Sequence, residues 1–182
     1  FVDLKLGVTP PYDSNRYAVS DLDVKAQDGA SVPLTLIRRK DAKGPQIVVV
    51  QAYGAYGFSQ LANFSFRTAS FLEAGGTYAF CHVRGGGELG EAWRLAGKDA
   101  NKPNSWRDLI ACAEDLIARG NTTKNELFVF SGSAGGITLG RALTERPDLF
   151  AGVIAIVPGV NTLRQEFQPV GPLNIPEFGT IK

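Results

Sequence analysis

The chain has 182 residues, of which 44% are hydrophobic and 20% are charged, and its formal net charge at pH 7 is +1. This length and composition are those of one globular domain with a sizeable core. Without a basic or acidic block, the charge gives no support to nucleic-acid binding or to attraction by a membrane surface. The sequence also has no apolar run near the roughly 20 residues that a membrane-spanning helix needs.

The first part of the chain predicts an arm, a hairpin and a buried strand. Residues 1–16 contain two adjacent prolines and an Asp-Ser-Asn run, which are typical of a linker or an incoming arm. Apolar and polar residues alternate over 17–25 and again over 32–39, on either side of an Asp28-Gly29 turn, and this pattern predicts an antiparallel hairpin. The β-branched run over 46–50 predicts a strand that is buried on both faces.

Strands and helices then alternate along the chain. The apolar periodicity predicts helices over 64–74, 106–119 and 137–146, and strands over 77–83, 127–130 and 152–157. The tail from 158 to 182 has scattered Pro and Gly residues and no periodicity. Because strands alternate with helices after the opening hairpin, we expect a mostly parallel α/β sheet.

The segment 126–136 predicts a nucleophile elbow, which is a sharp turn between a strand and a helix with a serine at its centre. Here the turn is Ser-Gly-Ser-Ala-Gly-Gly, and Ser133 is the central serine. Small residues are needed because a strained turn of this kind has no room for Cβ atoms near its centre. The pattern Gly-x-Ser-x-Gly is matched except at its first position, where Ser131 replaces glycine.

A second segment lies where the α/β-hydrolase fold needs it. In that fold the oxyanion hole takes one N–H from the residue after the nucleophile and one donor from the loop after the third strand. These positions are Ala134 and the glycine–aromatic loop that begins near Tyr53. The chemistry would be acyl transfer, in which Ser133 attacks a carbonyl after a base removes its proton. The competing interpretation is a glycine-rich turn with a purely structural role.

The base is not found in this chain. On the α/β-hydrolase fold the order is Ser, then Asp or Glu, then His, and no histidine follows Ser133. The one histidine, His82, precedes the elbow, and we expect it to be a structural residue near the sheet edge. Neither Asp148 nor Glu166 follows a seventh strand, so we expect neither to be the triad acid.

The glycine-rich loop at 85–90 offers a rival interpretation, because it satisfies the Gly-x-Gly-x-x-Gly pattern of dinucleotide-binding folds. That pattern must open a helix at once, and an acid about 20 residues later must end the next strand. Here the acid at that distance, Asp108, lies inside a predicted helix, so we reject nucleotide binding. Arg84 and Glu88 are expected to fix the geometry of the loop, with a role in the site as the alternative.

No metal or cofactor site is expected. The chain has one histidine and no Cys-x-x-Cys pair, so it lacks a typical set of zinc ligands. Cys81 and Cys112 fall inside a predicted strand and a predicted helix. We expect them to be small buried hydrophobic residues that do not form a disulfide.

Five stretches, taken together, resemble the catalytic domain of the prolyl oligopeptidase family of serine peptidases, especially its oligopeptidase B branch. They are residues 53–57, 82–90, 132–136, 146–150 and 177–179, in the order and spacing of that family. The resemblance implies that Ser133 is the peptidase nucleophile. It also implies that the Tyr53 phenol joins the Ala134 N–H in the oxyanion hole, and that Tyr56 lies beside the substrate pocket.

The resemblance leaves the residue preference at the cleaved bond open. Asn174 stands where the proline-specific branch holds a tryptophan, so we expect it to contact substrate. The acidic residues that select Arg and Lys in the oligopeptidase B branch are not clearly matched.

The resemblance also implies an incomplete catalytic domain. Residues 1–16 would be the arm from an N-terminal β-propeller domain that limits substrates to short peptides, and residues 17–182 would form part of the α/β-hydrolase domain. The triad Asp and His would lie beyond Lys182, so the 182 residues alone are expected to be inactive. We expect a cytoplasmic location, with the periplasm as the alternative. Two other functions stay open: an esterase of the same fold, and a non-catalytic binding fragment.

Overall fold

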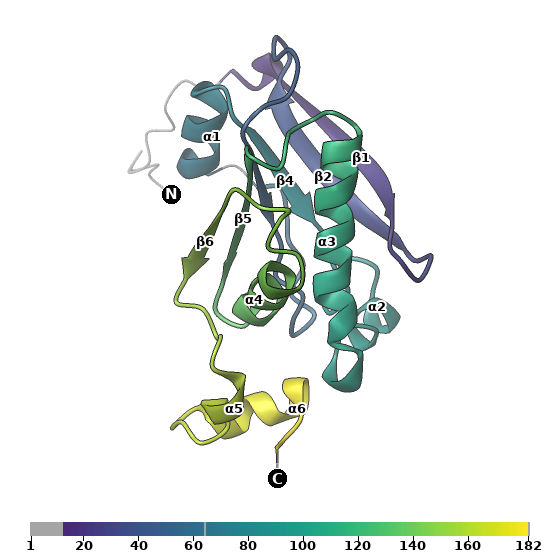
Figure 1. The fold of residues 1–182 in the computed structure, drawn as a ribbon, viewed down its shortest axis with the longest axis vertical. Helices are drawn as coiled ribbons and strands as arrows, with labels where there is room; N and C mark the ends of the chain where they lie inside the picture. The colour runs from purple at the N-terminus through teal and green to yellow at the C-terminus, as the bar shows by residue number, and fades with distance from the viewer. Residues whose placement is uncertain (1–12, 64, 182) are drawn as a thin grey trace, which may run out of the picture.

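The computed structural model describes residues 13–63 and 65–181, and within them six strands form one mixed sheet (Figure 1). The strands are β1 (Tyr17–Lys25), β2 (Ser31–Arg39), β3 (Val48–Gln51), β4 (Thr77–Cys81), β5 (Leu127–Gly132) and β6 (Gly152–Ile156). Their order across the sheet is β1-β2-β4-β3-β5-β6. The β1–β2 and β2–β4 pairs are antiparallel and the other pairs are parallel, which confirms the predicted α/β sheet with an N-terminal hairpin.

The helices alternate with the strands after the hairpin. They are α1 (Phe66–Glu73), α2 (Glu91–Leu95), α3 (Pro103–Ala118), α4 (Gly135–Glu145), α5 (Thr162–Gln165) and α6 (Ile175–Phe178), with short 3₁₀ turns η1 (Ser14–Arg16), η2 (Asp99–Asn101) and η3 (Gly171–Asn174). Helix α3 begins earlier than expected because Pro103 occupies its first turn, where a missing N–H costs nothing. The predicted arm, 1–16, lies mostly outside the described residues.

The sheet has a core on each face. Helices α3 and α4 pack over one face, where Val48 and Val50 of β3 meet Leu109 of α3. Helix α1 covers the other face, where Val49 meets Leu72. The alternation within β3 confirms a strand buried on both sides. Each fully buried side chain of this size stabilises the fold by about 1.5–3 kcal/mol.

Strand β5 is longer than its apolar run predicted. It continues to Gly132 because β6 pairs with it in parallel, with Ser131 opposite Ala155 and Gly132 opposite Ile156. The last paired residue of β5 therefore lies directly before Ser133. This pairing sets the position at which the chain leaves the sheet and turns into α4.

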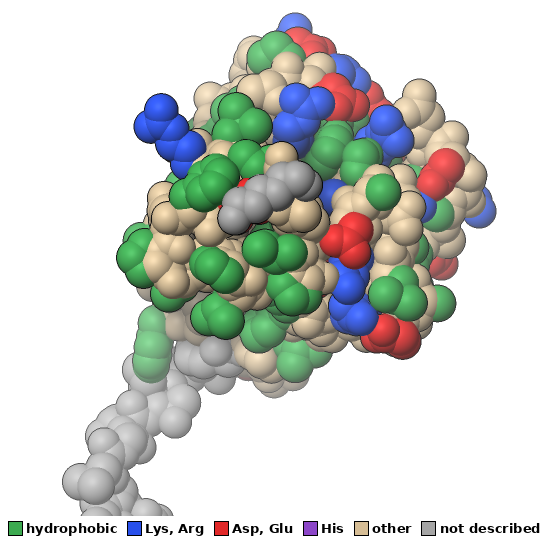
Figure 2. Space-filling model, turned by 90° about the horizontal axis from the view of Figure 1, so that it is seen from below, with side chains coloured by type: hydrophobic (Ala, Val, Ile, Leu, Met, Phe, Trp, Pro, Cys, Tyr) green, Lys and Arg blue, Asp and Glu red, His purple; other side chains and the backbone are tan. Residues whose placement is uncertain are grey.

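The tail beyond β6 contains α5, η3 and α6, which have no sequence signal because elements of four residues are too short to show a helical period. Figure 2 views this end of the molecule, and hydrophobic side chains gather on it. Leu163, Phe167, Val170 and Leu173 are among the exposed ones. Among the described residues, no helix has both the length and the apolar character needed to cross a membrane.

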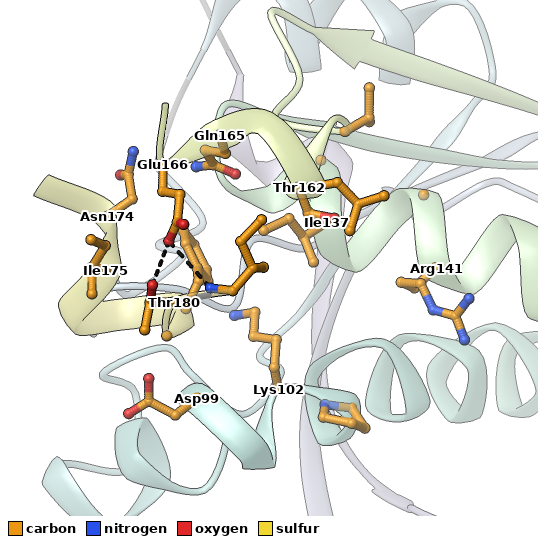
Figure 3. Close-up of a pocket in the computed structure, with 18 of the residues that line it drawn as sticks. Asp99, Lys102, Ile137, Arg141, Thr162, Gln165, Glu166, Asn174, Ile175 and Thr180 are labelled. Atoms are coloured by element: carbon orange, nitrogen blue, oxygen red, sulfur yellow. Dashed lines mark hydrogen bonds between the residues drawn. The ribbon is translucent and has the colours of Figure 1, made fainter. Parts of the chain in front are cut away.

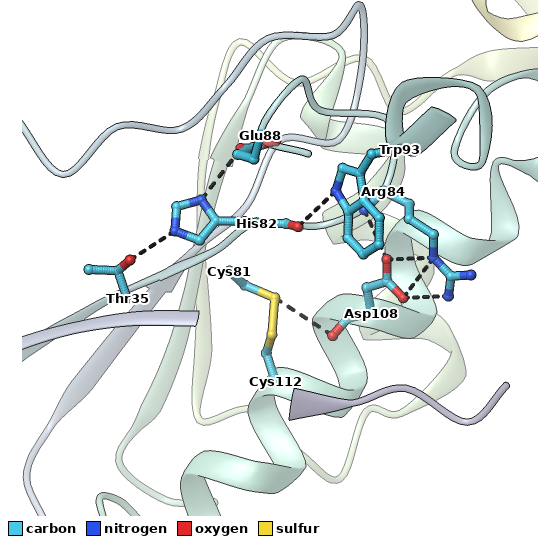
Figure 4. Close-up of a disulfide and its surroundings, with 8 residues drawn as sticks. All are labelled: Thr35, Cys81, His82, Arg84, Glu88, Trp93, Asp108 and Cys112. Carbon is cyan, nitrogen blue, oxygen red and sulfur yellow. Dashed lines mark hydrogen bonds and ion pairs between the residues drawn. A yellow bond between two sulfur atoms is a disulfide. The ribbon is translucent and has the colours of Figure 1, made fainter. Parts of the chain in front are cut away.

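The expectation about the cysteines was half wrong. Cys81 and Cys112 are fully buried, as predicted, but they form a disulfide (Figure 4). Cys81 ends β4 and Cys112 lies on the face of α3 that packs against the sheet, so the bond joins the two layers. Each cysteine was assigned correctly to its own element, but the contact between the elements has no signature in local sequence.

Candidate active site

Ser133 lies at the turn between β5 and α4, where its backbone has a φ of +49°. A positive φ is strained for a residue with a Cβ atom, and such strain is typical of a nucleophile elbow. The backbone is held in place by three hydrogen bonds. The Ser133 N–H donates to Ile156 O at 3.0 Å, and the Ser133 carbonyl accepts from Gly136 N at 3.0 Å and Gly159 N at 2.7 Å. The Ser133 side chain is exposed.

The glycines that follow Ser133 are required by close packing. A Cβ atom at Gly135 would lie 2.2 Å from Ser131 Oγ, and one at Gly136 would lie 2.7 Å from Gly159 N. Neither position has room for a side chain. The small residues of the elbow therefore let α4 approach the ends of β5 and β6 closely enough to leave Ser133 at the surface.

Ala134 precedes the first residue of α4, at the positive end of the helix dipole. Its N–H has no hydrogen-bond acceptor among residues 13–63 and 65–181. An unpaired backbone donor beside an exposed serine hydroxyl is what an oxyanion hole requires. Ala134 therefore meets this one requirement, and its oxyanion role stays a prediction.

Tyr53 lies in the loop after β3, against the start of α4. Its Cα would be 3.2 Å from a Cβ atom at Gly135, and its carbonyl accepts a hydrogen bond from Thr138 Oγ1 at 3.1 Å. The half-buried ring packs edge-on against Phe58, with 5.6 Å between ring centroids. Tyr53 is therefore next to the elbow, although it does not line the cavity described next.

A cavity of about 400 Å³ opens beside Ser133. Four of the five predicted site residues line it: Ser133, Ala134, Tyr56 and Asn174. The remaining lining residues are Val157, Pro158, Gly159, Val160, Asn161, Gln165, Gln168, Val170 and Gly171. Among the described residues, the lining thus contains no ionisable acid or base except the Tyr56 phenol, and it has four amide side chains.

Both the backbone and the side chain of Tyr56 contact the C-terminal segment, here meaning residues 158–181. Its N–H donates to Glu177 Oε1 at 2.8 Å, and its hydroxyl donates to Asn174 Oδ1 at 2.5 Å. Its ring packs edge-on against Phe178, with 5.6 Å between centroids. Burial, together with the nearby Tyr53 and Glu177, raises the pKa of the Tyr56 phenol above its ordinary value, so the phenol is neutral at physiological pH.

Lys102 contacts the loop after β3, which also carries Tyr56. Sequence reasoning did not single it out. Its buried ammonium group donates to the carbonyls of Gly54 and Gly97, and it lies 5.3 Å from the centroid of Phe178. Burial lowers the pKa of Lys102 to about 8, and the nearby Glu177 carboxylate opposes part of this shift. No local pattern distinguishes this lysine from the many that are exposed.

Arg84 and Glu88 fix loop geometry, as expected, but each does so by contacting residues outside the pair. Arg84 forms an ion pair with the buried Asp108 at 2.6 Å (Figure 4). It also forms one with Asp28 of the hairpin turn at 2.5 Å. Glu88 accepts a hydrogen bond from Gln60 N at 2.7 Å. Asp108, the acid of the rejected nucleotide motif, is therefore a structural partner of Arg84.

His82 is buried directly after the C-terminal end of β4, in agreement with the expected structural role. Its Nε2 lies 2.9 Å from Thr35 Oγ1, and its Nδ1 lies 3.4 Å from Glu88 Oε1. The side chain is thus held between the hairpin and the glycine-rich loop. Within the described part of the chain, no group of three or more His, Cys, Asp or Glu side chains could hold a metal ion.

A larger cavity of about 690 Å³ lies on the other side of the C-terminal segment (Figure 3). Gln165 and Asn174 line both cavities, so this segment forms the wall between them. Glu166 holds the end of the described chain here by accepting hydrogen bonds from Thr180 Oγ1 at 2.7 Å and Ile181 N at 3.3 Å.

Comparison with known proteins gives the family. The profile of the prolyl oligopeptidase family matches residues 62–179. The chain is 35% identical over 178 residues to dipeptidyl aminopeptidase BI from Pseudoxanthomonas mexicana, a match that covers 96% of this chain and 25% of that protein. It is 34% identical over 157 residues to a prolyl endopeptidase from Dictyostelium discoideum, covering 84% of this chain and 21% of that protein.

The fold agrees with the same family. The solved structure of oligopeptidase B from Leishmania major matches with a TM-score of 0.90 and 34% identity, covering 95% of this chain and 25% of that one. The chain thus spans about a quarter or less of the length of these relatives. By sequence and structure, the chain belongs to the prolyl oligopeptidase family and has the α/β-hydrolase fold of its catalytic domain.

Proposed function

We propose that the natural protein carrying this chain, here called the full-length protein, is a serine peptidase that hydrolyses short peptides through an acyl-enzyme on Ser133. The observation that carries the proposal is the strained, exposed Ser133 at the mouth of a cavity, beside the unpaired Ala134 N–H. The peptidase relatives support the same reaction class.

The reaction would proceed in two halves. Ser133 Oγ attacks the peptide carbonyl while a base takes its proton, and the negative charge that develops on the carbonyl oxygen is held by the Ala134 N–H and the Tyr53 hydroxyl. Collapse expels the amine, which takes a proton from the protonated base, and leaves an ester on Ser133. Water, deprotonated by the same base, then hydrolyses the ester and regenerates the serine.

The base and its acid partner are the parts that this chain does not supply. Residues 134–182 contain no histidine, and the His82 ring contacts Thr35 and Glu88. We therefore place the triad Asp and His in sequence outside these 182 residues, together with a propeller domain that would restrict substrates by size. The 182-residue chain alone is expected to be inactive.

Hydrolysis of a peptide amide and of a matched ester by the full-length protein tests the proposal. We expect turnover of both, and complete loss of both in a Ser133→Ala variant. Turnover of the ester alone would indicate an esterase. Unchanged amide hydrolysis by Ser133→Ala would contradict the assignment of the nucleophile.

A further inference from the structure

Two buried hydroxyl groups on either side of Ser133 reach back to the same short stretch of chain. Ser131 Oγ, at the end of β5, donates to the carbonyl of Ala52 at 2.6 Å. Thr138 Oγ1, in the first turns of α4, donates to the carbonyl of Tyr53 at 3.1 Å. Ser131 is 2% exposed and Thr138 is fully buried, so both hydrogen bonds are shielded from solvent.

The two carbonyls belong to consecutive peptide planes. The Ala52 carbonyl precedes the Cα atom of Tyr53, and the Tyr53 carbonyl follows it. Since a peptide unit is planar, holding the planes on both sides of one Cα atom fixes its φ and ψ. Each hydrogen bond restrains one of these planes, so Ser131 and Thr138 together restrain the direction in which the Tyr53 side chain leaves the backbone.

The surrounding packing is consistent with this arrangement. A Cβ atom at Gly135 would lie 2.2 Å from Ser131 Oγ and 2.9 Å from Tyr53 Cδ2, so the glycine makes room for both the hydroxyl and the ring. A threonine in a helix can donate to a carbonyl three or four residues earlier in the same helix. Thr138 instead donates across to the loop after β3.

We propose that Ser131 and Thr138 are positioning residues, which hold the Tyr53 phenol in place to receive the negative charge formed during attack by Ser133. The proposal rests on the function proposed above and assigns roles to two residues that do not touch the substrate. It also explains the serine at the first position of the elbow. The Ser131 hydroxyl joins the elbow to the loop that carries the second oxyanion donor.

The test is a set of variants in the full-length protein, assayed for kcat and KM on a peptide amide. We expect Thr138→Val and Ser131→Ala each to lower kcat about 10- to 100-fold with KM within about twofold, because a small displacement of a catalytic donor acts on the transition state. Thr138→Ser should restore most of the kcat lost in Thr138→Val. As a matched control, Thr122→Val removes a buried hydroxyl that donates to Gln46 O at 2.8 Å, before the opposite end of β3, and should leave kcat unchanged.

A double-mutant cycle with Tyr53→Phe separates positioning from a general structural effect. If the hydroxyls act through Tyr53, adding Thr138→Val or Ser131→Ala to Tyr53→Phe should lower kcat by less than about twofold. If the loss of kcat caused by Thr138→Val or Ser131→Ala is as large in the Tyr53→Phe background as in the wild type, the proposal is overturned. If Tyr53→Phe leaves kcat unchanged while Ser133→Ala abolishes activity, the positioning proposal fails and the peptidase function stands. Activity that survives Ser133→Ala would overturn both.

Discussion

The hydroxyl of Tyr56 donates a hydrogen bond to Asn174 Oδ1 over 2.5 Å, and this contact joins two segments that lie 118 residues apart in the chain. One segment is the loop after β3, next to the elbow. The other is the tail, whose short helices have no sequence periodicity. Both residues line the cavity at Ser133, so this hydrogen bond sets part of its shape and polarity.

The first prediction concerns the residue preference at the cleaved bond. Because the described cavity lining holds amides and no carboxylate, the full-length protein should cleave after uncharged side chains faster than after Arg or Lys. Asn174→Asp should raise kcat/KM for Arg and Lys substrates, relative to uncharged ones, by about 10- to 100-fold, since hydrogen bonds between charged groups contribute about 1.5–3 kcal/mol. A series of peptides that differ only at this residue measures the change.

The control for this variant is Asn15→Asp, which adds the same charge at the exposed η1 turn, outside the cavity. This control should leave kcat/KM for Arg and Lys substrates, relative to uncharged ones, unchanged. A wild-type protein that prefers Arg, or an Asn174→Asp variant with no shift relative to Asn15→Asp, would show that this cavity does not hold the selected side chain.

The second prediction separates the two tyrosines of the loop. Tyr53→Phe should lower kcat by about 10²–10³ with little change in KM, as expected for loss of one oxyanion donor. Tyr56→Phe removes the hydrogen bond to Asn174 and should act mainly on KM. Steady-state kinetics on one peptide substrate measures both, and a Tyr53→Phe variant that changes only KM would argue against the oxyanion role.

Much of this fold was predictable from local sequence. The β1–β2 hairpin follows from alternating residues around a turn whose Gly29 has a φ of +85°. The elbow follows from small residues between an apolar run and a helix. These features depend on one segment at a time, so their physical causes are present in the local sequence.

The unpredicted parts depend on contacts between distant segments. Neither the Cys81–Cys112 disulfide nor the Thr138 hydrogen bond to Tyr53 has a local signature, because each needs a strand or loop to meet a particular helix face. The four amide side chains of the cavity wall come from α5, η3 and the residues next to α5, and these elements are too short to show a period. Only the resemblance to a known family singled out Tyr56 and Asn174 beforehand.

The third prediction concerns the disulfide between β4 and α3. The bonded cysteines are 31 residues apart, and closing a loop of this length should add about 2–4 kcal/mol to the free energy of unfolding. Denaturant unfolding of the full-length protein, with and without reductant, measures the difference. The double variant Cys81→Ala, Cys112→Ala should match the reduced protein and lose its sensitivity to reductant. Reaction of Cys81 and Cys112 with a thiol reagent in the denatured protein, without prior reduction, would contradict the bond.

The fourth prediction concerns pH. Burial lowers the pKa of Lys102 to about 8 from 10.5, so between these values the unfolded chain binds more protons than the folded one. Stability then rises with pH in this window, and below about pH 8 the Lys102 contribution is constant. The free energy of unfolding of the wild type, minus that of Lys102→Met, should increase by up to about 3 kcal/mol from pH 7 to pH 10.5. If this difference in the free energy of unfolding does not change between pH 7 and pH 10.5, the pKa of Lys102 is not lowered in the folded protein.

The most direct test of the central claim is labelling of the full-length protein with a serine-directed fluorophosphonate, followed by mass spectrometry of the modified peptide. The elbow geometry predicts one adduct on Ser133 and loss of labelling in Ser133→Ala. An adduct that appears equally in Ser133→Ala, or no labelling of a protein that hydrolyses peptides, would contradict the assignment of Ser133 as the nucleophile.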